Sequence, residues 1–151
     1  MYYNKQIKEN DCGAATAATV FGIPYAEAFT LCKTAGDGTK SSDVFKAAKN
    51  LNNDSIFLSI GEELSNLWWL YNLSKKYPIY LGLSIKRQLA KRGRPNLDRH
   101  AVALIDGKIY DPSDGCEIDI DCFYNSCKSC IVNSMIIFGK ELETYGKGNN
   151  L

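Results

Sequence analysis

An α+β fold is predicted for this chain of 151 residues by the order of its sequence patterns. The first half reads as helices, beginning with an alanine-rich segment over residues 14–20. The second half alternates apolar and polar residues in the manner of half-buried strands, and its Asp106-Gly107 pair between two apolar runs is a strong hairpin signal. Helices first and an antiparallel sheet afterwards is the arrangement of an α+β domain.

Three helices are expected in the first half. The first follows Asn10 and Asp11, both good N-cap residues, and ends at Gly22. Its small side chains let neighbouring elements approach closely, which predicts a buried central helix. The second and third helices are expected over about residues 25–34 and 41–51.

The second half is expected to be mainly strands. The expected strands cover residues 55–60, 79–85, 100–105, 108–111 and 134–138. Two helices are expected over residues 62–76 and 121–126. The first carries Leu64, Leu67, Trp68, Leu70 and Tyr71 on one side. A basic loop is expected over residues 86–99.

Length and composition predict one domain over residues 1–151, with a disordered tail at 146–151. Hydrophobic residues make up 45% of the chain and charged residues 23%, and the net charge is +1. This balance gives no general attraction to nucleic acid or to membranes. Because the chain also lacks a signal-peptide pattern and any apolar run of about 20 residues, we expect a soluble cytoplasmic protein.

Six cysteines are many for a chain of this length. In a reducing compartment most should be thiols. Cys116, Cys122, Cys127 and Cys130 cluster late in the chain, but they contain one Cys-x-x-Cys pair where structural zinc sites usually show two. Ordinary thiols are therefore favoured over zinc, and no metal or other cofactor is expected.

Cys12 is a candidate nucleophile because it lies at the start of the first predicted helix. The positive end of the helix macrodipole favours the thiolate form at such a position. Gly13 beside it removes a side chain, so that a substrate carbonyl could approach. The alternative is a buried structural cysteine, a role that Cys32 fits well in the middle of an apolar helix.

His100 is the sole histidine and therefore the sole candidate base. A lone histidine is more often a satisfied core residue, but the hairpin geometry argues otherwise. A two-residue turn pairs Val102 with Asp111, which places Asp111 diagonal to His100 on one face, roughly 7–8 Å away at the backbone. Asp111 is therefore the favoured orienter of the imidazole, and Asp98, two residues before His100, is its rival.

Gln6 completes the candidate site. It lies six residues before Cys12, and its amide could donate to an oxyanion together with the backbone N–H of Cys12. A thiol, an imidazole and a carboxylate are the parts of an activated cysteine nucleophile. The chain is therefore predicted to carry out acyl transfer, most simply the hydrolysis of a peptide bond.

These residues lie in segments that resemble the papain-like C39 peptidases. The segments are Gln6, Asp11 to Ala15, Gly36 to Ser41, His100 to Leu104 and Asp111-Pro112. The resemblance covers most of the chain, and it implies a papain-like fold in which a helical half, with the nucleophile on a central helix, faces an antiparallel sheet.

The C39 peptidases remove double-glycine leaders from bacteriocin and peptide-pheromone precursors. The resemblance therefore implies that Gln6 is the oxyanion donor, Cys12 the nucleophile, His100 the base and Asp111 the orienter. The expected substrate is a peptide or protein.

Two other functions remain open at this level. The first is an enzyme that uses the same triad on another substrate or acceptor, as a glutamine deamidase or a transglutaminase does. The second is a papain-like binding module without catalytic activity. Nucleic-acid binding is not favoured, because the basic segment 86–99 has no interleaved aromatic residues. The oligomeric state is open.

Overall fold

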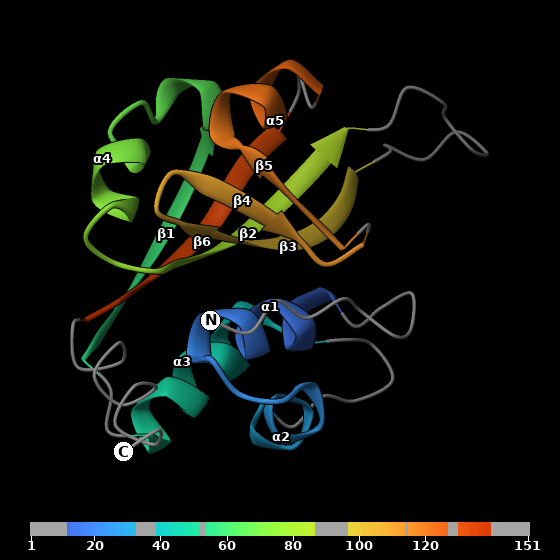
Figure 1. Ribbon diagram of the computed structural model, residues 1–151, viewed down its shortest axis with the longest axis vertical. Helices are drawn as coiled ribbons and strands as arrows, with labels where there is room; N and C mark the ends of the chain where they lie inside the picture. Colours follow the sequence, from blue (N-terminus) through green and yellow to red (C-terminus); the bar gives the residue numbers. More distant parts are fainter. Residues whose placement is uncertain are drawn as a thin grey trace.

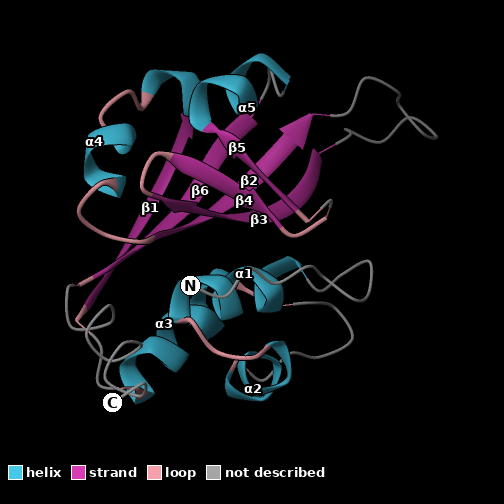
Figure 2. Ribbon diagram, viewed as in Figure 1, coloured by secondary structure: helices cyan, strands magenta, loops and turns pink. Residues whose placement is uncertain are grey.

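The fold is a single antiparallel sheet with helices on both of its faces, and we describe it from a computed structural model (Figure 1; Figure 2). The structure describes residues 12–32, 39–51, 54–86, 97–113, 115–126 and 130–139. This mixed architecture confirms the predicted α+β class.

Helices precede most of the strands, as the sequence predicts. The helices of the described part are α1 (Cys12–Phe21), α2 (Tyr25–Leu31), α3 (Ser41–Asn50), the 3-10 helix η1 (Leu64–Asn66), α4 (Leu70–Ser74) and α5 (Ile120–Ser126). The strands are β1 (Ser55–Glu63), β2 (Ile79–Lys86), β3 (Leu97–Ile105), β4 (Lys108–Asp111), β5 (Cys116–Asp119) and β6 (Cys130–Phe138). They form one sheet of six strands in the order β1-β6-β2-β3-β4-β5.

Two apolar cores lie on opposite faces of the sheet. Helices α1, α2 and α3 cover one face, where Phe21 of α1 meets Phe138 of β6 edge-on at 5.5 Å between ring centroids. The other face packs against η1, α4 and α5. Successive side chains of β3 point to opposite faces of the sheet, so Ala103 packs in the first core and Val102 and Leu104 pack in the second.

Helix α1 is the predicted buried central helix. Every residue from Gly13 to Phe21 is buried. Gly22 ends the helix with a φ of +67°, a left-handed conformation that glycine adopts without steric cost. The alanine-rich composition allows α1 to lie close to both β3 and α2, which fixes where its first residue, Cys12, stands relative to the sheet.

The β3–β4 hairpin has the predicted two-residue turn. Asp106 and Gly107 both have positive φ values, 53° and 77°, as a type I′ turn requires. The strands pair in the predicted register, with Leu104 opposite Ile109. The turn is held by α4, since the backbone N–H of Gly107 donates to Oγ of Ser74 at 2.9 Å.

The predicted helix over 62–76 is wrong. Strand β1 continues to Glu63, because a bulge after Ser59, with Gly61 at a φ of +85°, lets Glu62 and Glu63 pair again with β6. Helix then resumes only as η1 and the short α4. Of the predicted apolar side, Leu64, Leu67 and Leu70 do pack in the second core, but Trp68 and Tyr71 are exposed.

Several strand boundaries also differ from the prediction. β3 begins at Leu97, so His100 lies inside a strand instead of opening one, and β2 extends to Lys86. β5 was not predicted, and β6 begins at Cys130 instead of 134. Each extension is paired with a neighbour in the sheet, and such long-range pairing is absent from local sequence patterns. Helix α2 ends at Leu31, three residues earlier than predicted.

In the part of the chain that the structure describes, no helix is both long and apolar enough to span a bilayer. The proposed tail at 146–151 and the middle of the basic loop, 87–96, lie outside the described residues.

Candidate active site

Cys12 is the first residue of α1 and is partly exposed. Backbone N–H groups at the start of a helix have no partner within it, and they give this end partial positive charge. The structure therefore places the predicted nucleophile beside backbone N–H groups that are able to donate to an oxyanion.

Gly13 does not open space for a substrate, contrary to the expectation from sequence. It is buried, and a Cβ built on it would lie 2.8 Å from Cβ of Thr39 and 2.9 Å from the carbonyl oxygen of Thr39. The hydroxyl of Tyr80 would be 3.3 Å away. The glycine is required because the segment leading into α3 passes against the first turn of α1.

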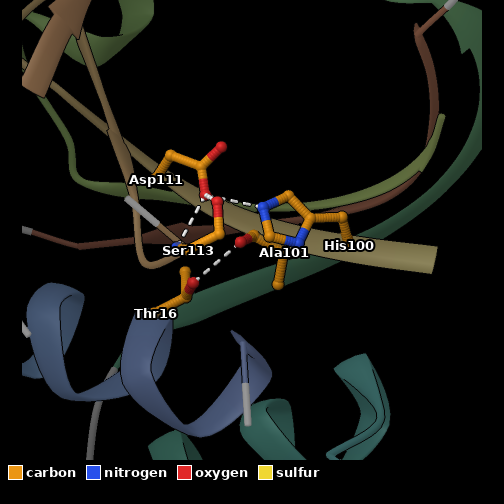
Figure 3. A network of polar contacts seen from close by, with 5 residues as sticks. All are labelled: Thr16, His100, Ala101, Asp111 and Ser113. Atoms are coloured by element: carbon orange, nitrogen blue, oxygen red, sulfur yellow. Dashed lines mark hydrogen bonds and ion pairs between the residues drawn. The ribbon is translucent and has the colours of Figure 1, made fainter. Parts of the chain in front are cut away.

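His100 and Asp111 form the contact that the hairpin register predicts. Nε2 of His100 lies 2.7 Å from Oδ1 of Asp111, and the two side chains are only 15% and 16% exposed (Figure 3). The pairing of β3 with β4 ends at Ala103 and Tyr110, so the bond runs diagonally beyond the last paired residues. The side chain of the rival, Asp98, lies outside the described part of the structure.

Ser113 is a site residue that the sequence reasoning missed. Its backbone N–H donates to Oδ1 of Asp111 at 2.9 Å, and its hydroxyl donates to the same oxygen at 2.7 Å (Figure 3). An aspartate that accepts from the backbone N–H two residues later forms an Asx turn. The Asp-Pro-Ser order was therefore the signal that could have found it. Ser113 therefore holds the same carboxylate oxygen that contacts the His100 imidazole.

The electrostatics of the site favour a charged imidazole. Burial alone lowers the pKa of His100, but hydrogen bonds and charge from Asp111 and Cys12 outweigh burial and raise it from 6.5 to about 9. Burial alone would raise the pKa of Asp111. The hydrogen bonds and charge of His100 and the bonds from Ser113 outweigh burial, so the pKa of Asp111 falls below its usual 3.8. Since Nε2 is engaged by Asp111, Nδ1 is the ring nitrogen available to Cys12, and it points away from Asp111 (Figure 3).

The other described cysteines contrast with Cys12. Burial, with the charge of Asp43, raises the pKa of the Cys32 thiol to about 12, so it is a structural residue. Cys122 is exposed on α5 and Cys130 is buried in β6. Within the described ranges, no group of three or more His, Cys, Asp or Glu residues is placed to hold a metal ion.

The structure thus brings three of the four predicted site residues together, namely Cys12, His100 and Asp111. Gln6, the fourth, lies outside the described residues, as does Asp11. The catalytic role of all four remains a prediction.

Known proteins are similar to this chain in fold. No family model and no curated protein sequence matches it. Among solved structures, the chain is similar to the peptidase domain of Streptococcus ComA, described as a bifunctional ABC transporter of a quorum-sensing pathway. The TM-score is 0.57 and the identity 19%, over 91% of this chain and 98% of that one.

Two further structures show the same similarity. A double-glycine-motif protease from an AMS/PCAT transporter, solved with its leader peptide, gives a TM-score of 0.60 at 20% identity, over 91% of this chain and 89% of that one. The peptidase domain of Streptococcus mutans ComA gives 0.54 at 21% identity, over 91% and 99%. The chain therefore has the papain-like fold of C39 peptidase domains, as the sequence resemblance implied.

Proposed function

We propose that this protein is a cysteine peptidase that cleaves a peptide bond through a thioester intermediate. The observation that carries the proposal is the position of His100, which is bonded to Asp111 and interacts with Cys12 at the start of α1. The fold shared with peptidase domains supports the same reading. The cytoplasm, a reducing compartment, suits an enzyme that needs Cys12 as a thiol.

The proposed reaction uses Cys12, His100 and Gln6. The Cys12 thiolate attacks the carbonyl carbon of the substrate, and the oxyanion accepts from the backbone N–H of Cys12 and from the amide of Gln6. The His100 imidazolium gives its proton to the leaving amine as the C–N bond breaks, which leaves a thioester on Cys12. Neutral His100 then takes a proton from water, whose oxygen attacks the thioester carbonyl. The C–S bond breaks, the carboxylic acid leaves, and the Cys12 thiolate and the His100 imidazolium are restored.

The substrate class is proposed from the structural neighbours. One of them is a double-glycine-motif protease bound to a leader peptide, so peptides with a Gly-Gly pair are the first to test. A deamidase or a transglutaminase would use the same thioester chemistry, and the mass of the product separates these reactions.

The test is mass spectrometry of a Gly-Gly leader-peptide set, with added free amine, after incubation with the protein. Peptidase activity is expected to give two fragments whose masses sum to the substrate plus one water. A gain of about 1 Da at a glutamine would identify a deamidase, and addition of the amine with loss of ammonia a transglutaminase. An unchanged substrate with Cys12 as unreactive as Cys32 would identify a binding module and contradict the proposal.

Activity is expected to persist to about pH 9 and to fall above it. The imidazolium that protonates the leaving amine has a pKa of about 9, and it is lost as the pH rises through that value. The same shift gives folding stability that is fully present below pH 6.5, the usual His value, and is lost through about pH 9. The measurement is kcat/KM against pH, with circular dichroism to show that the protein stays folded.

A plateau that ends near pH 6.5 would contradict the assignment of His100. In Asp111→Asn the residual activity should fall at a lower pH than the activity of the wild type does, because the carboxylate that raises the His100 pKa is gone.

A further inference from the structure

A buried hydrogen bond ties the helix of the nucleophile to the strand of the base. Thr16 lies four residues after Cys12, which places both on one side of α1. Its side chain is buried, at 1% exposure for the residue, and Oγ1 donates to the carbonyl oxygen of Ala101 at 3.0 Å. Ala101 directly follows His100 in β3 (Figure 3). The bond therefore joins the turn of α1 that follows Cys12 to the residue of β3 that follows His100.

The remaining packing between α1 and β3 at this point is made by small apolar residues. Ala17, Ala18, Ala101 and Ala103 belong to the same buried core. Such contacts stabilise by the apolar area that they bury and have little directional preference. The bond from Thr16 has a preferred length and angle, and it selects one position.

The bond from Thr16 contacts β3 at Ala101, in the part of the strand that does not pair with β4. The pairing of β3 with β4 ends at Ala103 and Tyr110, before the strand reaches Ala101 and His100. Beyond that point β3 is held by β2, where Ala101 faces Gly82, and by α1. The part of β3 that carries the base is therefore located partly through Thr16.

We propose that Thr16 is a positioning residue that sets the distance between the Cys12 thiolate and the His100 imidazole. The proposal rests on the proposed peptidase function, and it assigns Thr16 no contact with substrate. A displacement of about 1 Å between reacting groups can cost on the order of 10²-fold in rate. We therefore expect Thr16→Val, which keeps the shape and removes the hydroxyl, to lower kcat by roughly 10- to 100-fold with little change in KM.

The matched control is Thr19→Val. Thr19 is also buried in α1, and its Oγ1 donates to the carbonyl oxygen of Ala15, in the same helix, at 3.1 Å. Thr19→Val should keep kcat. Thr16→Ser, which retains the hydroxyl, should also keep kcat, and an equal loss in Thr16→Ser and Thr16→Val would overturn the proposal, since the methyl group would then be the cause.

The decisive readout is the rate of Cys12 alkylation by iodoacetamide across pH, which needs no peptide substrate. In Thr16→Val the alkylation rate should fall across the neutral pH range, because His100 is no longer held beside the sulfur of Cys12, and in Thr19→Val the profile should stay unchanged. Thermal unfolding of each variant shows whether it is folded. A folded Thr16→Val with the wild-type profile overturns the positioning role.

His100→Ala separates this failure from a failure of the proposed function. If His100→Ala also leaves the alkylation profile unchanged, Cys12 and His100 do not act together and the proposed function fails. If His100→Ala moves the profile and Thr16→Val does not, only the role of Thr16 fails.

Discussion

Cys12→Ala is expected to abolish peptide cleavage, and His100→Ala to lower kcat by on the order of 10⁴-fold or more. The first change removes the atom that forms the thioester, and the second removes the acid and base of both half-reactions. Both side chains lie at the edge of the apolar core and not at its centre, so the fold should survive. The measurement is kcat on a cleaved peptide, with circular dichroism for the fold.

Cys32→Ala is the matched control, because it removes a buried thiol whose pKa of about 12 keeps it protonated. It should keep kcat, although it should lower the unfolding temperature by leaving a small cavity. Wild-type Cys12 should also react with iodoacetamide much faster than Cys32. Equal alkylation rates at the two positions, or a Cys12→Ala variant that still cleaves, would remove the case for an activated nucleophile.

Asp111→Asn is expected to lower kcat by on the order of 10³–10⁴-fold, the scale seen when a triad carboxylate becomes an amide. The 2.7 Å bond to Nε2 holds the imidazole with Nδ1 toward Cys12, and the negative charge stabilises the imidazolium. An amide removes the charge and can present its NH₂ group to the ring. The measurement is kcat with KM, where KM should change little.

Asp106→Asn provides the comparison within the same hairpin. Asp106 is exposed at the turn and pairs with Lys75 at 3.1 Å, away from the imidazole. It should keep kcat, and so should Asp98→Asn. If Asp98→Asn produced the large loss and Asp111→Asn did not, the assignment of the orienter would be wrong.

Local patterns determined the parts of this fold that depend on neighbours in sequence. The alanine-rich run encodes α1, and Asp106-Gly107 encodes a type I′ turn. The turn in turn sets the register that brings Asp111 to His100, because side chains alternate with a period of two along each strand. For these reasons the sequence predicts three of the proposed catalytic residues and the contact between two of them.

Tertiary structure decided what local patterns do not contain. The leucines at 64, 67 and 70 satisfy a helical period, but pairing of Glu62 and Glu63 with β6 extends β1 and breaks the predicted helix. Gly13 is explained only by the approach of Thr39, and Thr16 only by the carbonyl of Ala101, 85 residues away. Such features depend on packing and hydrogen bonds between segments that are far apart in the sequence, and these contacts exist only in the folded chain.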